Sequence, residues 1–202
     1  MAVAAVLFAA CSEGGECVIK GSVPEDVSTV SLINQDEVVL DSCYVANGKF
    51  RFSCEKKKDV AVALIMDKYA DPITLIPDAS SITVKVGEKG ANISGSKRSK
   101  ELSALQTWAI NMYMTTSGEL EKLFEAKDYE AAEAFVDKRD ADIIKHCKPI
   151  FKAHKDDYVG VQAMVLIYNK LDRNEFVKLY ESAGPCVQED FRLLGYYNNI
   201  KK

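Results

Sequence analysis

Apolar and polar residues alternate along the first half of the chain with the period of two that is typical of β-strands. Short alternating runs are separated by turn residues such as Asp71-Pro72, Pro77-Asp78 and Gly87, and together they predict seven or eight strands. The runs cover residues 17–23, 27–33, 38–45, 50–54, 59–66, 73–76 and 82–86. So many short strands in about 80 residues favour an antiparallel β-sandwich.

The strongest turn signal in this half is Asn47-Gly48, because a type I′ turn needs positive φ at both central residues. It predicts a hairpin in which Val45 faces Phe50 and Cys43 faces Phe52. Strand parity then separates a core face from an outer face. The expected core face holds Cys43, Val45, Phe50, Phe52 and Cys54, and the outer face holds Tyr44, Lys49 and Arg51. Cys43 and Cys54 would lie diagonally, either as free core thiols or as a disulfide.

From Ser96 onward the apolar residues recur every three or four positions, which predicts four or five helices. Gly118 could kink the first helix, and Pro149 should bend or end the second. The expected N-caps of the later helices are Asp128, Asp156 or Asp157, and Asp172. The sequence therefore predicts an α+β fold with a β-sandwich domain at residues 17–95 and a helical domain at residues 96–202.

An uncharged apolar run, AVAAVLFAA at residues 2–10, ends at Cys11. It is too short to cross the roughly 30 Å hydrocarbon core, so it is interpreted as the tail of a signal peptide. Small residues before a cysteine are typical of bacterial lipoproteins, which makes Cys11 the predicted lipidation site and residues 1–16 a signal and tether. No Lys or Arg precedes the run and Phe8 replaces the usual Leu, so an N-terminal apolar strand is the alternative. The lipid would anchor the protein to a membrane of the cell envelope, on the periplasmic side or at the outer membrane.

The net charge of −4, with acids and bases interspersed, argues against nucleic-acid binding. The basic clusters Lys56-Lys57-Lys58 and Lys97-Arg98 are interpreted as a solvated hairpin end and a solvated helix start. The composition, 48% hydrophobic and 28% charged, is that of an ordinary folded protein.

The six cysteines, at positions 11, 17, 43, 54, 147 and 186, contain no C-x-x-C pair, so the dithiol of an oxidoreductase is missing. His146-Cys147 and His154 lack the three or four closely spaced ligands that zinc needs, and no metal or cofactor is predicted. The acidic pairs Asp36-Glu37 and Asp156-Asp157 do not fit a calcium loop and are assigned to turns and caps. No nucleophile elbow, metalloprotease helix or phosphate loop is present, so no catalytic residue is predicted and the chain is not expected to be an enzyme.

The order of these elements resembles a known family. The resemblance rests on Cys11, Ile19-Lys20-Gly21, Tyr44 to Phe52, Ile73 to Asp78 before Ser81 to Val84, and Leu171 to Phe176. On these residues the chain resembles the N-terminal domain-of-unknown-function module of lipid-anchored thiol:disulfide oxidoreductases of Bacteroidota. Those proteins also carry a thioredoxin-like domain of the AhpC-TSA family. In that family the W-C-x-x-C motif of the thioredoxin-like domain performs the redox chemistry. Trp108, the one Trp here, has no Cys beside it, and the chain ends where that domain would begin, so the resemblance implies the fold and location but not the activity.

Two functional hypotheses follow. The first is a non-catalytic, lipid-anchored envelope protein that binds a ligand or a protein partner. The second is a truncated or accessory component of a thiol:disulfide system, in which a free thiol such as Cys147 or Cys186 forms mixed disulfides with a partner.

Overall fold

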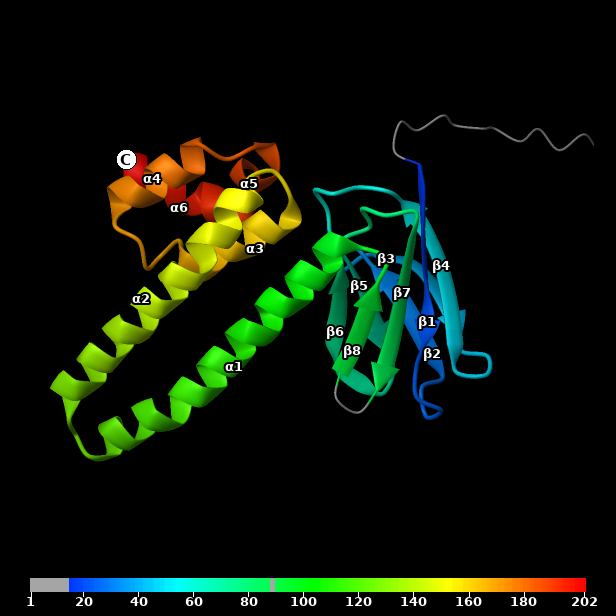
Figure 1. The fold of residues 1–202 in the computed structure, drawn as a ribbon, viewed down its shortest axis with the longest axis horizontal. Helices are drawn as coiled ribbons and strands as arrows, with labels where there is room; N and C mark the ends of the chain where they lie inside the picture. The colour runs from blue at the N-terminus through cyan, green and yellow to red at the C-terminus, as the bar shows by residue number, and fades with distance from the viewer. Residues whose placement is uncertain (1–14, 88–89) are drawn as a thin grey trace, which may run out of the picture.

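The computed structural model describes residues 15–87 and 90–202, and these form eight strands followed by six helices, the predicted α+β fold (Figure 1). The strands are β1 (Glu16–Ser22), β2 (Thr29–Ile33), β3 (Val39–Tyr44), β4 (Lys49–Glu55), β5 (Val62–Met66), β6 (Tyr69–Leu75), β7 (Ser81–Gly87) and β8 (Gly90–Ser94). The helices are α1 (Lys97–Glu125), α2 (Tyr129–Ala153), α3 (Tyr158–Ile167), α4 (Arg173–Glu181), α5 (Pro185–Gln188) and α6 (Phe191–Lys201). We call β1–β8 the sandwich lobe and α1–α6 the helical lobe.

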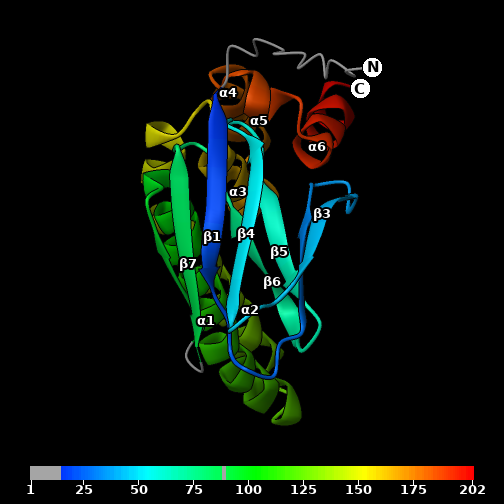
Figure 2. The same cartoon turned by 90° about the vertical axis from the view of Figure 1, so that its right-hand side faces the viewer.

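The eight strands form two four-stranded sheets with the orders β4-β1-β7-β8 and β3-β2-β5-β6. Figure 2 shows β7, β1 and β4 side by side across one face of the sandwich lobe. The pairing differs from a purely antiparallel sandwich at one place, because β1 and β7 are parallel. Between these two strands the chain forms β2 and β3 of the second sheet, β4 of the first, and β5 and β6 of the second, and β7 then runs in the direction of β1.

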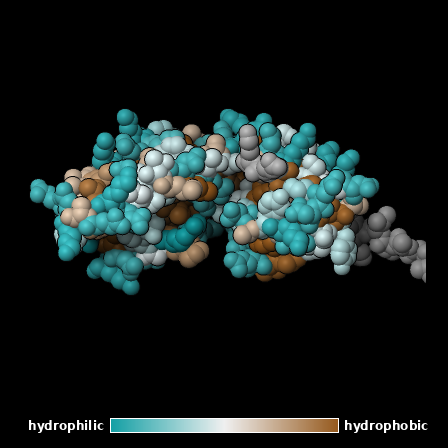
Figure 3. Space-filling model, turned by 90° about the horizontal axis from the view of Figure 1, so that it is seen from below, coloured by the Kyte–Doolittle hydropathy of each residue, from teal (hydrophilic) through white to brown (hydrophobic). Residues whose placement is uncertain are grey.

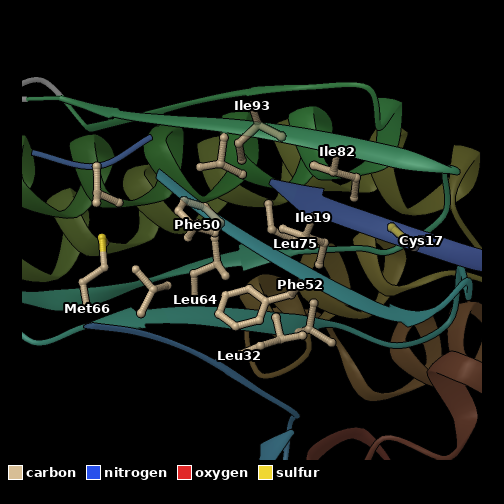
Figure 4. Packing of buried hydrophobic residues seen from close by; sticks show 14 of the residues in the cluster. Cys17, Ile19, Leu32, Phe50, Phe52, Leu64, Met66, Leu75, Ile82 and Ile93 are labelled. Atoms are coloured by element: carbon tan, nitrogen blue, oxygen red, sulfur yellow. The ribbon is translucent and has the colours of Figure 1, made fainter. Parts of the chain in front are cut away.

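The core of the sandwich lobe lies between the two sheets and follows strand alternation (Figure 4). Cys17 and Ile19 of β1, Phe50 and Phe52 of β4, and Leu64 of β5 are all buried there. Full burial of a large apolar side chain contributes roughly 1.5–3 kcal/mol, so this face of each strand fixes the register of the pairing.

The Asn47-Gly48 turn was predicted correctly, but the hairpin around it was not. Asn47 and Gly48 have φ of 53° and 66°, as a type I′ turn requires. Only Ala46 and Lys49 form a bridge across the turn. Beyond it β3 pairs with β2 and β4 pairs with β1, so Cys43 faces Val30 rather than Phe52. The turn is therefore a corner at which the chain changes sheet, and the inner faces of both sheets share one core.

The helical lobe begins with two long antiparallel helices, α1 and α2, and α3 to α6 gather near the end of α2 (Figure 1). Helix α1 runs through Gly118 without interruption, and α2 continues four residues past Pro149, where an end or a bend was predicted. Fully buried Phe151 holds this last turn in the core, which offsets the hydrogen bond that Pro149 cannot donate. The predicted caps Asp128, Asp157 and Asp172 each accept a backbone hydrogen bond. Four-residue α5 raises the number of helices to six.

The two lobes meet where α1 leaves the sandwich. Buried Ile76, Leu102 and Val159 pack together at this junction. Ser99 Oγ donates to Ile76 O (3.0 Å) and accepts from Ile76 N (2.9 Å), so the first turn of α1 is tied to the residue that follows β6. In Figure 3 the lobes are joined by a narrower waist, and hydrophobic residues are exposed in patches between hydrophilic ones.

No helix within residues 15–87 and 90–202 is long and apolar enough to cross a membrane. Cys11, the predicted lipidation site, lies outside the described residues.

Candidate functional site

A groove of about 580 Å³ lies where the ends of β1 and β7 meet the start of β4. The alternation that buries Ile19, Phe50 and Phe52 turns their neighbours Lys20, Lys49 and Arg51 outward. These three side chains line the groove together with Lys85 of β7. We call the site formed by Lys20, Lys49, Arg51 and Lys85 the basic groove.

The strand registers set the spacing of the charges in the basic groove. Two rows of side chains cross the three strands. In the order β4, β1, β7 they are Arg51, Lys20 and Thr83 in one row, and Lys49, Ser22 and Lys85 in the other. Directly opposed side chains in a sheet have Cβ atoms about 4.5–5.5 Å apart. Four cations and two hydroxyl groups therefore lie within a small area.

Nothing in the described part of the chain neutralises these cations. Lys20, Lys49, Arg51 and Lys85 are all exposed, and none forms an ion pair with residues 15–87 or 90–202. None of the eleven residues that line the groove is acidic. Because like charges opposite one another destabilise a sheet, this cluster costs stability unless an anion lies between them.

The shape of the groove depends on β3 and on Gly21. Cys43 and Tyr44 at the end of β3 contribute one wall, and the Tyr44 ring is 88% exposed. A Cβ atom on Gly21 would lie 1.9 Å from the Val84 carbonyl oxygen and 2.8 Å from the Phe50 ring. Glycine thus lets β1 approach β7 closely while Phe50 fills the space beneath, and the groove has a firm floor.

A second polar cluster, which we call the junction network, connects the two lobes. Asp157 Oδ2 accepts hydrogen bonds from Arg98 Nε (2.7 Å) and lies 2.8 Å from His154 Nδ1. Arg98 also donates to Asp78 Oδ2 (3.0 Å), and His154 Nε2 lies 3.5 Å from Glu101 Oε2. The network therefore joins the loop after β6, the start of α1 and the loop between α2 and α3.

Asp157 is buried and contacts both Arg98 and His154. Burial opposes its ionisation, but hydrogen bonds from His154 and Arg98 outweigh that effect and hold its pKa below the usual value. Both ring nitrogens of His154 face carboxylates, so the hydroxyl or thiol nucleophile of a catalytic triad is missing from this position. The geometry supports docking of the lobes rather than group transfer.

The two thiols that the sequence analysis singled out, Cys147 and Cys186, are poorly placed for thiol–disulfide exchange. Cys147 is fully buried, and burial raises its pKa to about 12. Cys186 Sγ donates to Asp59 O (3.2 Å), and burial followed by nearby acids, Asp59 first, raises its pKa to about 12 as well. Few thiolates form at neutral pH under these conditions.

All five described cysteines are free, including Cys43 and Cys54. Cys54 instead lies directly opposite Cys17 in the pairing of β1 with β4. Cys43 and Cys54 are not diagonal neighbours in a hairpin, as was expected, because their strands belong to different sheets.

The remaining candidates from the sequence are dispersed. The His146 ring stacks on Trp108 with centroids 3.7 Å apart, and burial lowers the His146 pKa. No group of three potential metal ligands forms within the described residues. Lys58 pairs with exposed Asp156, and Asp36 lies in a turn capped by Asn34. Arg98 differs from the expectation of a solvated helix start, because it pairs with Asp78 and Asp157 at the lobe junction.

The basic groove was only partly foreseeable. Parity placed Lys49 and Arg51 on an outer face, as observed, but Lys20 and Lys85 were not singled out. Their own strands alternate in the same way, so their outward direction could have been deduced. That β1 lies between β4 and β7 depends on tertiary pairing, and this pairing is what gathers the four charges.

In a comparison with known proteins, residues 17–102 match the model of a family described as a domain of unknown function, DUF4369. The match covers the eight strands and the first turns of α1, which includes the basic groove and the α1 side of the junction network. No curated protein and no solved structure matches the chain. The domain-of-unknown-function part of the resemblance is therefore confirmed, and the family supplies no activity.

Proposed function

We propose that this chain is a non-catalytic binding module, held at the cell envelope by a lipid on Cys11, whose basic groove binds a soluble ligand with several negative charges. The observation that carries this proposal is the set of four cations on three adjacent strands, none of which forms an ion pair with the described residues. A binding site needs charges that the protein itself leaves unneutralised, and the fold provides them at one place.

The ligand class that fits best is an anionic oligosaccharide. A volume of about 580 Å³ lies within the usual range of about 300–1,000 Å³ for ligand pockets. The cations on both sides of Ser22 and the cation beside Thr83 can bind two or more sulfate, phosphate or carboxylate groups along one ligand. The exposed ring of Tyr44 offers an apolar face on which a sugar ring can stack, and the two hydroxyl groups can bond to sugar hydroxyls.

The position of the groove favours a soluble ligand over the surface of the membrane. Strand β1 begins at Glu16, five residues after Cys11 in the sequence, and ends at Ser22 in the groove. At about 3.3 Å per residue, the part of β1 that lines the groove, Lys20 to Ser22, lies roughly 13–20 Å beyond the start of the strand. An anchor on Cys11 would therefore hold the opposite end of the strand at the membrane.

The test uses a heparin-derived oligosaccharide as an anionic probe and a neutral oligosaccharide of equal length as its control. Isothermal titration of the full chain should give binding to the anionic probe that weakens as salt is added, because salt screens exposed charges. The double variant Lys20→Gln/Arg51→Gln should bind the anionic probe with an affinity that is lower by about tenfold or more. The charge-matched control is Lys100→Gln/Lys145→Gln, two exposed lysines on α1 and α2.

Three outcomes would count against this proposal. Equal binding of the neutral probe would exclude recognition of charge. Equal losses of affinity in both double variants would show that binding depends on the net charge of the protein and not on the groove. If the groove variant lost binding to vesicles containing anionic phospholipid but kept its affinity for the oligosaccharide, the groove would be a membrane contact.

The alternative function is that of an accessory component in a thiol:disulfide system. The observation that favours it is the direct opposition of Cys17 and Cys54. If the chain acted as a reductase, it would reduce insulin disulfides in the presence of a chemical reductant. The binding-module proposal expects no turnover above that of the reductant alone.

A further inference from the structure

Two thiols face each other at one end of the sandwich core. Cys17 of β1 and Cys54 of β4 are direct partners in the antiparallel ladder, and both are free. Cys17 is fully buried, and Figure 4 shows it beyond Ile19 and Phe52 at the end of the row of core side chains. Cys54 is half-buried. No other pair of described cysteines is matched in a strand register.

The ladder brings the two residues within the range of a disulfide. Lys56 N–H donates to Gly15 O (3.0 Å), so Cys17 and Cys54, two residues further along, form a hydrogen-bonded pair. Cα atoms of such a pair are about 5.5 Å apart, which is the usual separation in disulfides of about 5.5–6 Å. The Cβ atoms must approach each other by about 1 Å or more, and β4 can adjust because it is the edge strand of its sheet.

Only one of the two thiols can be reached from outside. Cys54 lies on the wall of a cavity of about 490 Å³, which is also lined by Asn34, Leu40, Val60 and Pro77. Cys17 does not line this cavity and lies behind Cys54 in the core. This arrangement resembles an attacking thiol at the surface with a resolving thiol beneath it.

The acidity of the thiols determines the kind of chemistry. Burial raises the pKa of Cys17 to about 12, with the neighbouring Cys54 as the next cause, and burial also raises the pKa of Cys54. Thiolates are therefore scarce at neutral pH and exchange is slow. Such a pair suits a bond that forms once and persists better than repeated catalytic turnover.

We propose that Cys17 and Cys54 form an intramolecular disulfide when the chain meets an oxidised small-molecule disulfide. The Cys54 thiolate attacks one sulfur of the oxidant, which gives a mixed disulfide and releases one thiol. The Cys17 thiolate then attacks Cys54 Sγ and releases the second thiol. Two protein thiols are oxidised and one oxidant disulfide is reduced to two thiols, so electrons and protons balance. This site is independent of the basic groove and of the ligand proposed for it.

The experiment is a peptide map of the full chain under non-reducing conditions. The reduced protein is incubated with oxidised glutathione at mildly alkaline pH, and the remaining thiols are then alkylated. Cleavage after both basic and glutamate residues separates Cys17, within Cys17–Lys20, from Cys11, and Cys54, within Phe52–Glu55, from Cys43. The expected product is the disulfide that joins these two peptides. The alkylated forms of both peptides should decrease together as it appears.

The matched control is Cys147→Ala, which removes a buried thiol that has no cross-strand cysteine partner and should leave the linked peptide unchanged. Cys17→Ala and Cys54→Ala should each abolish it. Separate alkylation of Cys17 and Cys54 in oxidised protein with an unchanged circular dichroism spectrum would overturn the proposal, as would linkage of Cys54 to Cys43 or Cys11. The wild-type map decides the matter even if a cysteine variant fails to fold.

Discussion

Replacing Asp157 by alanine tests whether the junction network holds the two lobes together. The Asp157 side chain is 6% exposed. Its Oδ2 lies 2.7 Å from Arg98 Nε and 2.8 Å from His154 Nδ1, and its Oδ1 accepts hydrogen bonds from the amides of Val159 (3.0 Å) and Gly160 (3.4 Å). One truncation thus removes both an ion pair and the N-cap of α3.

The size of the effect follows from these contacts. Removing one partner of a buried ion pair costs about 3–5 kcal/mol because the other charge stays uncompensated. The Arg98 side chain is 35% exposed and keeps its ion pair with Asp78, so water and Asp78 recover part of this cost and the lower end applies. The lost cap is included in the total and accounts for about 1 kcal/mol of it. We therefore expect Asp157→Ala to lower the free energy of unfolding by about 3 kcal/mol, and Tm by about 6–12 °C.

Two further variants separate the contributions. Asp157→Asn keeps a capping oxygen of nearly the same shape but loses the charge, so it should cost about 2 kcal/mol. Asp156→Ala removes the neighbouring exposed carboxylate, which pairs with exposed Lys58, and it should change stability by less than about 1 kcal/mol. Urea unfolding followed by circular dichroism measures all three against the wild type.

The pH dependence supplies an independent check. The pKa of Asp157 is lower in the folded chain than in the unfolded chain, so its charge stabilises the fold above the unfolded pKa of about 4. That contribution is lost as the pH falls through the lowered folded pKa. The difference in free energy of unfolding between wild type and Asp157→Asn should have its full value at neutral pH and should shrink in strong acid.

Two results would refute this reasoning. One is an Asp157→Ala variant that is no less stable than Asp156→Ala. The other is a difference between wild type and Asp157→Asn that stays constant from neutral pH into strong acid.

Four further outcomes are expected. Gly21→Ala should prevent stable folding or sharply lower Tm, because its Cβ would overlap the backbone of β7, whereas a normal thermal transition would contradict the close approach. Gly118→Ala, in the interior of α1 with open space around the new Cβ, should raise stability by about 1 kcal/mol in the same assay. Cys11→Ala should move the protein from the membrane fraction to the soluble fraction, and an unchanged distribution between the two fractions would refute the proposed lipid anchor. Oxidation of Cys17 and Cys54 closes a loop of about 37 residues and should raise the free energy of unfolding by up to about 4 kcal/mol, which urea titration with and without reductant measures.

Local patterns in the sequence were enough to predict the elements and the fold class. Alternation with period two identified seven of the eight strands, and spacing of three and four identified every helix except four-residue α5, because burial of one face controls both patterns. Short β8 was not identified, since Gly90–Ser94 has few apolar positions. The caps Asp157 and Asp172 and the turn at Asn47-Gly48 were also predictable, because each depends on only a few neighbouring residues.

The arrangement of these elements was decided by the tertiary structure. Parity turned Arg51 outward, but the pairing of β1 with both β4 and β7 brought Lys20 and Lys85 beside it. The same pairing set Cys54 opposite Cys17 instead of near Cys43. Side-chain direction is a property of each strand alone, whereas strand neighbours are chosen by packing of two sheets around one core. The sequence by itself therefore determined which residues face outward, and the fold determined which of them meet.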